Sequence, residues 1–228
     1  MNLLILGCGK TGSLVIEVAR ARGHHVQVLD EPENKNAVGL TPDFLAPIDV
    51  VVDFTTPKAV VPNAEATIQA GRNMVVGTTG WYEQLPRLRE LVLQAKTGFL
   101  YGSNFSIGVN LFFEIARAAA PTLRYGYSGQ IFERHHAQKK DAPSGTAIVL
   151  QKIVREASGK EEELEIVSFR EGDVVGMHEI TFNSSHDRIY LCHDAQSRRG
   201  FAEGAVRAAE WLAGKQGFFD FRDVWKQL

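Results

Sequence analysis

The 228-residue chain is predicted to adopt an α/β fold, with a doubly wound parallel sheet and a second α+β domain that carries a mixed or antiparallel sheet. Two observations predict this fold. Short apolar strands alternate with amphipathic helices through roughly the first hundred residues, which is typical of parallel strands joined by crossover helices. Beyond residue 106 the alternation stops, and strand-like stretches follow one another with turn-forming residues between them.

The first part of the chain opens with a βαβ unit. Asn2–Leu6 has the composition of a buried strand, Thr11–Arg22 has the apolar spacing of a helix, and His25–Leu29 is again strand-like. The segment 31–47 is shorter and more polar than the other crossovers, and whether it contains a helix stays open. After it, we expect strands at Asp49–Phe54, Asn73–Val76 and Phe99–Tyr101, and helices at Lys58–Ala70 and Tyr82–Lys96.

The second part begins with an apolar helix at Asn110–Ala120 and a strand at Gly129–Glu133. A polar loop then leads into a helix at Ser144–Ser158. Three β-rich stretches joined by short turns follow, and they predict an antiparallel meander over Leu164–Phe169, Gly176–Phe182 and Arg188–His193.

The last predicted helix, Gly200–Leu212, has small residues on one face. An α+β domain inserted into a doubly wound one would allow this helix to rejoin the first sheet. We therefore predict a discontinuous first domain, 1–106 plus 199–228, and a second domain, 107–198.

Composition and charge exclude several classes of protein. A formal net charge of -2 provides no field for holding a polyphosphate backbone, so no nucleic-acid partner is expected. The apolar runs have strand length and are too short for a membrane span. The first residues form a strand-like segment without the features of a secretory signal, so we expect a cytoplasmic protein. Cys8 and Cys192 are far apart and predict neither a disulfide nor a metal site.

A glycine-rich turn separates the first strand from the first helix. Residues 7–12, Gly-Cys-Gly-Lys-Thr-Gly, fit the G-x-G-x-x-G pattern, in which glycines allow a tight turn and backbone N–H groups approach a pyrophosphate. Asp30 ends the next strand, where a carboxylate can accept hydrogen bonds from a ribose diol. This context favours a Rossmann-like dinucleotide site over a merely tight turn. The predicted cofactor-binding residues of the turn and the strand end are Gly7, Gly9, Lys10, Thr11, Gly12 and Asp30.

The residues after Asp30 bear on which dinucleotide binds. Glu31 follows where an arginine would favour a 2′-phosphate, and an anionic pair repels that phosphate. NADH is therefore favoured over NADPH, although Lys35 is close enough in sequence to offset the effect. We expect NADH, NADPH or both as cofactor, with NADH preferred.

Two further loops follow strands of the predicted parallel sheet. Gly77-Thr78-Thr79-Gly80 and Gly102-Ser103-Asn104-Phe105-Ser106 both lie at carboxyl ends of strands, which face the ligand crevice in an open α/β sheet. Their polar residues could contact a nicotinamide; the alternative is two ordinary turns.

The segment 133–147 combines proton donors with a helix start. His135, His136, Lys139 and Lys140 lie in a loop, and the helix that begins at 143–146 offers free N–H groups to a carboxylate, with a hydroxyl from Ser144 or Thr146. Adjacent histidines usually diverge, and no acidic or cysteine partner has ligand spacing, so no metal is expected. The alternative is a solvated basic loop before a capped helix.

Residues 135–147 closely resemble the H-H-x-x-K-x-D-A-P-S-G-T-A motif of the 4-hydroxy-tetrahydrodipicolinate reductase (dihydrodipicolinate reductase) family. The resemblance spans nearly the whole chain. Further matching segments are the glycine loop, Asp53-Phe54-Thr55, residues 77–80, 104–110 and 170–176, Ser197-Arg198 and Phe201-Ala202.

The resemblance implies hydride transfer from NAD(P)H to a cyclic imine with two carboxylates. The implied reaction reduces (2S,4S)-4-hydroxy-2,3,4,5-tetrahydrodipicolinate to tetrahydrodipicolinate in diaminopimelate and lysine biosynthesis. It also implies a dinucleotide-binding domain built from both chain ends, a central substrate-binding and oligomerisation domain, and a homotetramer.

The resemblance assigns roles to individual side chains. His135 is implied as proton donor or acceptor and Lys139 as the general acid, while His136, Ser144, Gly145 and Thr146 would bind a substrate carboxylate. The cofactor-binding residues that it adds are Phe54, Gly77, Thr78, Thr79, Ser103, Asn104, Phe105, Arg198 and Phe201.

The sequence departs from the family pattern at a few positions. Thr11 stands where a methionine is common, Asp30 where many members have glutamate, and the connection 158–164 is short, which could alter the assembly. Two other functions stay open: a non-catalytic NAD(H)-binding redox sensor, and a reductase of another small dicarboxylate. A sensor would have no reason to keep His135, His136 and Lys139 beside an anion cradle.

Overall fold

The computed structural model describes all residues, 1–228, as two compact units. The first unit comprises Met1–Ile107 and Arg199–Leu228, and the second comprises Gly108–Arg198. None of the helices combines the length and the apolar composition needed to cross a membrane.

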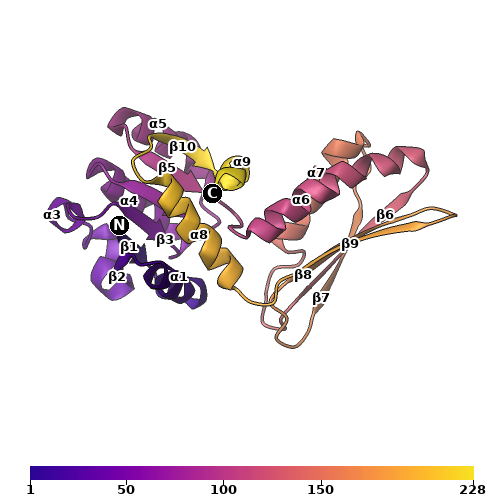
Figure 1. The fold of residues 1–228 in the computed structure, drawn as a ribbon, viewed down its shortest axis with the longest axis horizontal. Coiled ribbons are helices and arrows are strands. Elements are labelled where there is room, and N and C mark those ends of the chain that lie inside the picture. The colour runs from indigo at the N-terminus through magenta and orange to yellow at the C-terminus, as the bar shows by residue number, and fades with distance from the viewer. The chain divides into compact units, whose positions relative to one another are not determined.

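The first unit contains a six-stranded sheet in which every pair of neighbouring strands is parallel (Figure 1). The strand order is β10-β5-β4-β3-β1-β2, so the order reverses beside β1, which is where doubly wound sheets bind ligands. The predicted parallel sheet is confirmed. The strands are β1 Asn2–Leu6, β2 His25–Leu29, β3 Val50–Asp53, β4 Asn73–Val76, β5 Gly98–Tyr101 and β10 Gly217–Asp220.

Helices cover both faces of this sheet. On one face, α1 (Lys10–Ala21) and α8 (Arg199–Leu212) pack side by side through small and β-branched residues (Figure 1). On the other, α4 (Pro57–Gln69) and α5 (Leu85–Ala95) pack against the side chains that the strands direct to that face. The central strands are thus buried on both sides, which explains their continuous apolar sequences.

Residues 31–47, for which the presence of a helix stayed open, contain two short helices, α2 (Glu31–Asn34) and α3 (Pro42–Leu45). Two details of the first unit differ from the prediction. The helix predicted from Tyr82 begins at Leu85, after one 3-10 turn. The strand β10 and the short helix α9 (Phe221–Val224) were not predicted, because a four-residue apolar run carries no periodicity that distinguishes a strand from a helix.

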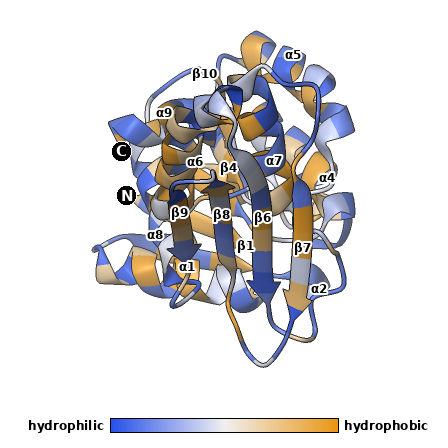
Figure 2. Ribbon diagram, turned by 90° about the vertical axis from the view of Figure 1, so that its right-hand side faces the viewer, coloured by the Kyte–Doolittle hydropathy of each residue, from blue (hydrophilic) through white to orange (hydrophobic).

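The second unit has a mixed four-stranded sheet in the order β7-β6-β8-β9, which Figure 2 shows face on. Its strands are β6 Ser128–His135, β7 Glu165–Arg170, β8 Met177–Asn183 and β9 Arg188–Asp194. One face of the sheet carries Ile131, Ile180 and Phe182, which share an apolar core with the helices α6 (Ile107–Ala119) and α7 (Gly145–Ser158).

The predicted antiparallel meander is wrong for its first strand. β8 pairs with β9 in antiparallel fashion as predicted, but β7 pairs with β6 and runs parallel to it. The physical reason is that α7 acts as a crossover between β6 and β7 and returns the chain to the same end of the sheet. Strand patterns show where strands lie but do not show which strands pair.

Candidate active site

The glycine turn after β1 is tightly packed at two glycines and open at the third. A Cβ on Gly12 would lie 1.9 Å from the carbonyl oxygen of Gly7, and a Cβ on Gly7, whose φ is +89°, would lie 2.6 Å from that of Phe54. Gly9, in contrast, would meet nothing within 4 Å. Since Gly9 precedes the first turn of α1, a ligand phosphate can approach the helix N-terminus at this point.

Two cavities flank this turn. One, of about 410 Å³, is lined by residues of the turn, by Asp30 and Glu31, and by Lys35, Phe54 and Lys58, among others. The other, of about 350 Å³, is lined by Lys10 and Thr11 and by residues 77–79. The structure therefore brings most of the predicted cofactor-binding residues to two neighbouring cavities, and the residues present fit a dinucleotide.

Asp53, at the end of β3, is fully buried and hydrogen-bonds to residues that line the two cavities. Its Oδ1 accepts hydrogen bonds from the backbone N–H and hydroxyl of Thr55 and from the hydroxyl of Thr78, at 2.9, 2.7 and 3.0 Å. Its Oδ2 accepts one from Asn63 at 2.8 Å. Burial raises the pKa of Asp53, and these hydrogen bonds oppose the rise. The carboxylate was not among the predicted site residues.

The remaining predicted cofactor residues have different surroundings. Phe105 is buried, and its ring packs 6.2 Å from that of Phe54 and 4.6 Å from that of Phe221. Asn104 accepts a hydrogen bond from the backbone of Ser106. Ser103 is exposed in the same loop. Phe201 lies in α8 of the first unit, whereas Arg198 is the last residue of the second.

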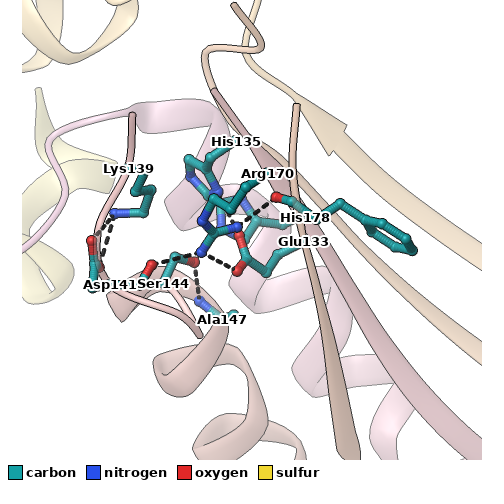
Figure 3. Close-up of polar contacts among 9 residues, drawn as sticks. Glu133, His135, Lys139, Asp141, Ser144, Ala147, Arg170 and His178 are labelled. Carbon is teal, nitrogen blue, oxygen red and sulfur yellow. Dashed lines mark hydrogen bonds and ion pairs between the residues drawn. The ribbon is translucent and has the colours of Figure 1, made fainter. Parts of the chain in front are cut away.

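In the second unit, a buried cluster forms at the end of β6 (Figure 3). Glu133 and His135 are two residues apart on the strand, so both side chains point to the same face. Oε2 of Glu133 lies 2.5 Å from Nδ1 of His135. The ring of His178, on β8, packs edge-on against that of His135 with centroids 5.1 Å apart.

Arg170 connects this cluster to the loop that carries Lys139. It lies opposite His135 in the parallel pairing of β6 with β7. Its Nη2 donates to Oε1 of Glu133 at 2.6 Å and to the backbone oxygen of Asp141 at 2.7 Å. The Asp141 carboxylate in turn accepts two hydrogen bonds from Nζ of Lys139, at 2.8 and 2.9 Å (Figure 3).

The charges of the cluster follow from these contacts. Burial alone would raise the pKa of Glu133, but hydrogen bonds from Arg170, Ser168 and His135 hold it below its usual value. Burial lowers the pKa of His135, against the effect of Glu133, and lowers the pKa of His178 to about 3. The pKa of Asp141 is lowered, mainly by the hydrogen bonds from Lys139. The cluster therefore holds an ionised carboxylate beside two neutral imidazoles.

The start of α7 was predicted to bind a carboxylate. Ser144 is only 2% exposed. Its hydroxyl accepts from the backbone N–H of Ala147 at 3.2 Å and lies 3.0 Å from Nε2 of His178. Ser144 is thus an N-cap held by a buried histidine. Gly145 is exposed, with nothing within 4 Å of a Cβ at that position, and Thr146 and His136 are half-buried.

Glu133, His135 and His178 are close enough to share a metal ion, since their candidate ligand atoms lie within 4.8 Å of one another. Both oxygens of Glu133 are, however, engaged by His135 and Arg170, and the guanidinium on that carboxylate would repel a divalent cation. The arrangement favours proton handling over metal binding.

The sequence did not identify Glu133, Arg170 or His178 as site residues. One signal was available for Glu133, because residues two apart on a strand share a face and His135 was already a candidate. Arg170 and His178 come from other strands, and only the strand pairing brings them to the cluster.

Comparisons with known proteins cover the whole chain. The family models described as dihydrodipicolinate reductase, N-terminus, and dihydrodipicolinate reductase, C-terminus, match residues 1–105 and 108–225. A relative from Christiangramia forsetii, named 4-hydroxy-tetrahydrodipicolinate reductase, is 39% identical and the match covers 100% of this chain and 99% of the relative. A relative of the same name from Archaeoglobus fulgidus is 38% identical, with 98% and 99% covered.

Solved structures are similar over the same length. One, described as a dipicolinate-bound dihydrodipicolinate reductase from Paenisporosarcina sp. TG-14, has a TM-score of 0.79 and 25% identity, with 98% of this chain and 99% of that chain covered. An amine dehydrogenase from Mycobacterium smegmatis has a TM-score of 0.66 at 10% identity, covering 98% of this chain and 95% of that chain, which shows a shared fold alone.

Proposed function

Because this chain belongs to the dihydrodipicolinate reductase family, we propose that it reduces 4-hydroxy-tetrahydrodipicolinate to tetrahydrodipicolinate in diaminopimelate and lysine biosynthesis. Membership in the family implies NAD(P)H as the reductant. The observation that carries the proposal is the cluster of Glu133, His135 and Arg170 beside Lys139. It supplies proton-transfer groups that a dinucleotide-binding sensor would not need.

The chemistry needs a cationic site that holds a dicarboxylate. A bound NAD(P)H would supply the hydride, and the ring that accepts it gains electron density. The 4-hydroxyl group leaves as water, so the net change is the addition of one hydride and one proton with the loss of one water. Lys139 is proposed as the general acid that protonates this ring, and His135 as a second proton donor or acceptor. The N–H groups at the start of α7, with Gly145, Thr146 and His136, would hold a carboxylate. Ser144 would hold the start of α7 in place through its hydrogen bond with the buried His178.

We propose NADH as the preferred cofactor. Asp30 and Glu31 both line the 410 Å³ cavity beside the glycine turn, where two carboxylates oppose the binding of a 2′-phosphate. Lys35 and Lys58 line the same cavity and reduce that effect. Comparing kcat/KM for the two cofactors tests the preference, and a strong preference for NADPH would refute it.

The assembly is a separate proposal. The face of the second sheet that turns away from the helices exposes large side chains, including Phe169 of β7 at 39% and Tyr190 of β9 at 58%. Family resemblance suggests that such sheets join in a cytoplasmic homotetramer. Light scattering coupled to size-exclusion chromatography should give the mass of four chains, and a stable monomer would refute the tetramer.

The experiment that tests the function follows NADH and NADPH oxidation while the substrate is generated from pyruvate and aspartate semialdehyde by the preceding synthase. Oxidation that depends on the synthase is the expected result. If either cofactor binds by calorimetry but neither is oxidised, the dinucleotide site stands and the sensor, or a reductase of another dicarboxylate, replaces the proposal.

A further inference from the structure

We propose that Glu133 is a positioning residue for catalysis: it fixes His135 in the tautomer that carries its proton on Nδ1, and so keeps Nε2 available to exchange a proton with the substrate. This inference rests on the proposed function, because it takes His135 as a proton-transfer group. It adds a residue and a tautomer that the roles above do not include.

The geometry of β6 brings the Glu133 carboxylate to Nδ1 of His135. Glu133 and His135 share one face of β6, and Oε2 of Glu133 lies 2.5 Å from Nδ1 of His135. An ionised carboxylate only accepts hydrogen bonds, so the hydrogen between these atoms belongs to Nδ1. In a neutral imidazole this leaves Nε2 with a lone pair.

The Glu133 carboxylate cannot turn away from His135. Glu133 is fully buried at 0% exposure. Its other oxygen, Oε1, accepts from Nη2 of Arg170 at 2.6 Å, and Ser168, opposite Glu133 on β7, also hydrogen-bonds to it. With both oxygens held, the carboxylate stays ionised and presents Oε2 to the imidazole in one orientation. A carboxylate that orients an imidazole in this way also stabilises the imidazolium if Nε2 takes a proton.

Gly176 and His178 are two neighbours of the His135 ring. A Cβ on Gly176 would lie 3.0 Å from Nε2 of His135, so only glycine at that position leaves the nitrogen uncrowded. The neighbouring ring of His178 is buried, and its pKa of about 3 keeps it neutral, so it places no positive charge beside His135. Since Glu133 occupies Nδ1, Nε2 is the ring nitrogen left for a proton partner, and Gly176 borders it without a side chain.

Arg170 links Glu133 and His135 to the loop that carries Lys139. The same Nη2 atom of Arg170 that holds Glu133 also donates to the backbone oxygen of Asp141, and Asp141 holds Lys139. The two proposed proton-transfer groups are therefore tied to one guanidinium. A disturbance at Glu133 reaches His135 directly and Lys139 through Arg170.

A spectroscopic measurement on the wild-type protein tests the tautomer without any assay of activity. In the ¹⁵N-labelled protein near neutral pH, two-bond couplings between the ring nitrogens and carbon-bound protons distinguish the two tautomers of His135. A His135→Asn variant assigns the signal. We expect the proton on Nδ1. A predominant Nε2–H tautomer would overturn the proposal, even if the reductase activity is established.

The matching variant is Glu133→Gln, which keeps the shape of the side chain but replaces one of the two accepting oxygens with an NH2 donor. We expect kcat to fall by about 10²–10⁴-fold, with little change in KM, and the His135 tautomer to become mixed. Glu161→Gln, on an exposed turn of the same unit, is the control and should leave kcat unchanged. A folded Glu133→Gln enzyme with wild-type kcat would contradict the proposal.

The outcomes separate the two proposals. If the wild-type protein lacks reductase activity but His135 carries its proton on Nδ1, the proposed reaction fails and the role of Glu133 in fixing the tautomer stands. If Glu133→Gln does not fold, as judged by circular dichroism, the tautomer of the wild-type protein alone decides. If activity is present and the tautomer is Nε2–H, only the role of Glu133 is wrong.

Discussion

Lys139 is held at the site by one carboxylate, since both oxygens of Asp141 accept hydrogen bonds from its Nζ. This contact positions the ammonium group, and a substrate carboxylate would add a second anionic partner. Lys139 is half-buried, in contrast to the buried His135.

Replacing the ammonium tests its role directly. Lys139→Ala should lower kcat by about 10²–10⁴-fold, because the general acid is lost, while the Kd for NADH stays nearly the same. Lys140→Ala, which changes the exposed neighbouring lysine, is the matched control. Steady-state kinetics and calorimetry provide the two readouts, and unchanged turnover in Lys139→Ala would refute the assignment.

His178 predicts a pH dependence of stability. Burial lowers its pKa to about 3 in the folded protein, while an unfolded histidine titrates near about 6.5. Between these values the unfolded state binds more protons, so this histidine makes the free energy of unfolding decrease as the pH falls from the unfolded value toward the folded one. The loss at about pH 4.5 relative to about pH 7 is on the order of 2–3 kcal/mol.

Urea unfolding of His178→Gln at these two pH values provides the measurement. The variant should lose less stability on acidification than the wild-type protein, because its side chain does not titrate. His186→Gln, in the exposed turn between β8 and β9, should behave like the wild-type protein. Equal losses in wild type and His178→Gln would show that the buried imidazole is not the cause.

Among the elements of the first unit, Asp53 connects segments that line the two cavities beside the glycine turn. It bonds to Thr78 after β4, to Thr55 after β3 and to Asn63 on α4. Asn63 accepts a further hydrogen bond from Asn34 on α2 at 2.9 Å. One buried chain of hydrogen bonds therefore connects four segments around the predicted dinucleotide site.

The direction of these hydrogen bonds can be tested with a swap. Asp53→Asn places an amide group against the amide of Asn63, and we expect the free energy of unfolding in urea to fall by about 1–3 kcal/mol, since a buried mismatch costs about that much. Adding Asn63→Asp restores a donor and acceptor in each contact and should recover most of the stability. The exposed variant Asp43→Asn is the control. A double variant no better than Asp53→Asn alone would contradict this account.

The two sheets differ in how far the sequence predicts them. The alternation of apolar strands and helices predicted the parallel sheet, because strands buried on both faces have continuous apolar sequences. Pairing in the second sheet was wrong for β7, since alternation along a strand does not identify its neighbour. That pairing places Arg170 beside Glu133, so the error in the sheet and the missed site residue have one cause.

At the scale of the whole chain, the first unit is completed by the C-terminal segment. Strand β10 pairs with β5, and Glu210 on α8 forms an ion pair with Arg22 at 2.7 Å and a hydrogen bond with His24 at 2.8 Å. The small residues of α8 predicted that this helix would return to the first sheet, and its packing beside α1 shows that it does. The strand β10 lacked such a signal because it is only four residues long.

Part of the candidate site consists of continuous segments that the sequence can predict, and part is formed only when the chain folds. The glycine turn and the segment 135–147 are continuous in sequence, and both were predicted from residue type and spacing. The cluster around His135 combines side chains from β6, β7 and β8, and only the folded sheet brings them within hydrogen-bond distance or ring contact.

Hydride transfer to the substrate ring is the reaction proposed for this protein, and an isotope label can follow it. The most direct test supplies NADH deuterated at C4 of the nicotinamide, in each stereochemical form, together with substrate freshly made by the synthase, and analyses the product by mass spectrometry. We predict tetrahydrodipicolinate that carries a single deuterium from one of the two forms. Binding of NADH without any deuterium in a product would contradict the claim and would leave a dinucleotide-binding protein with a different role.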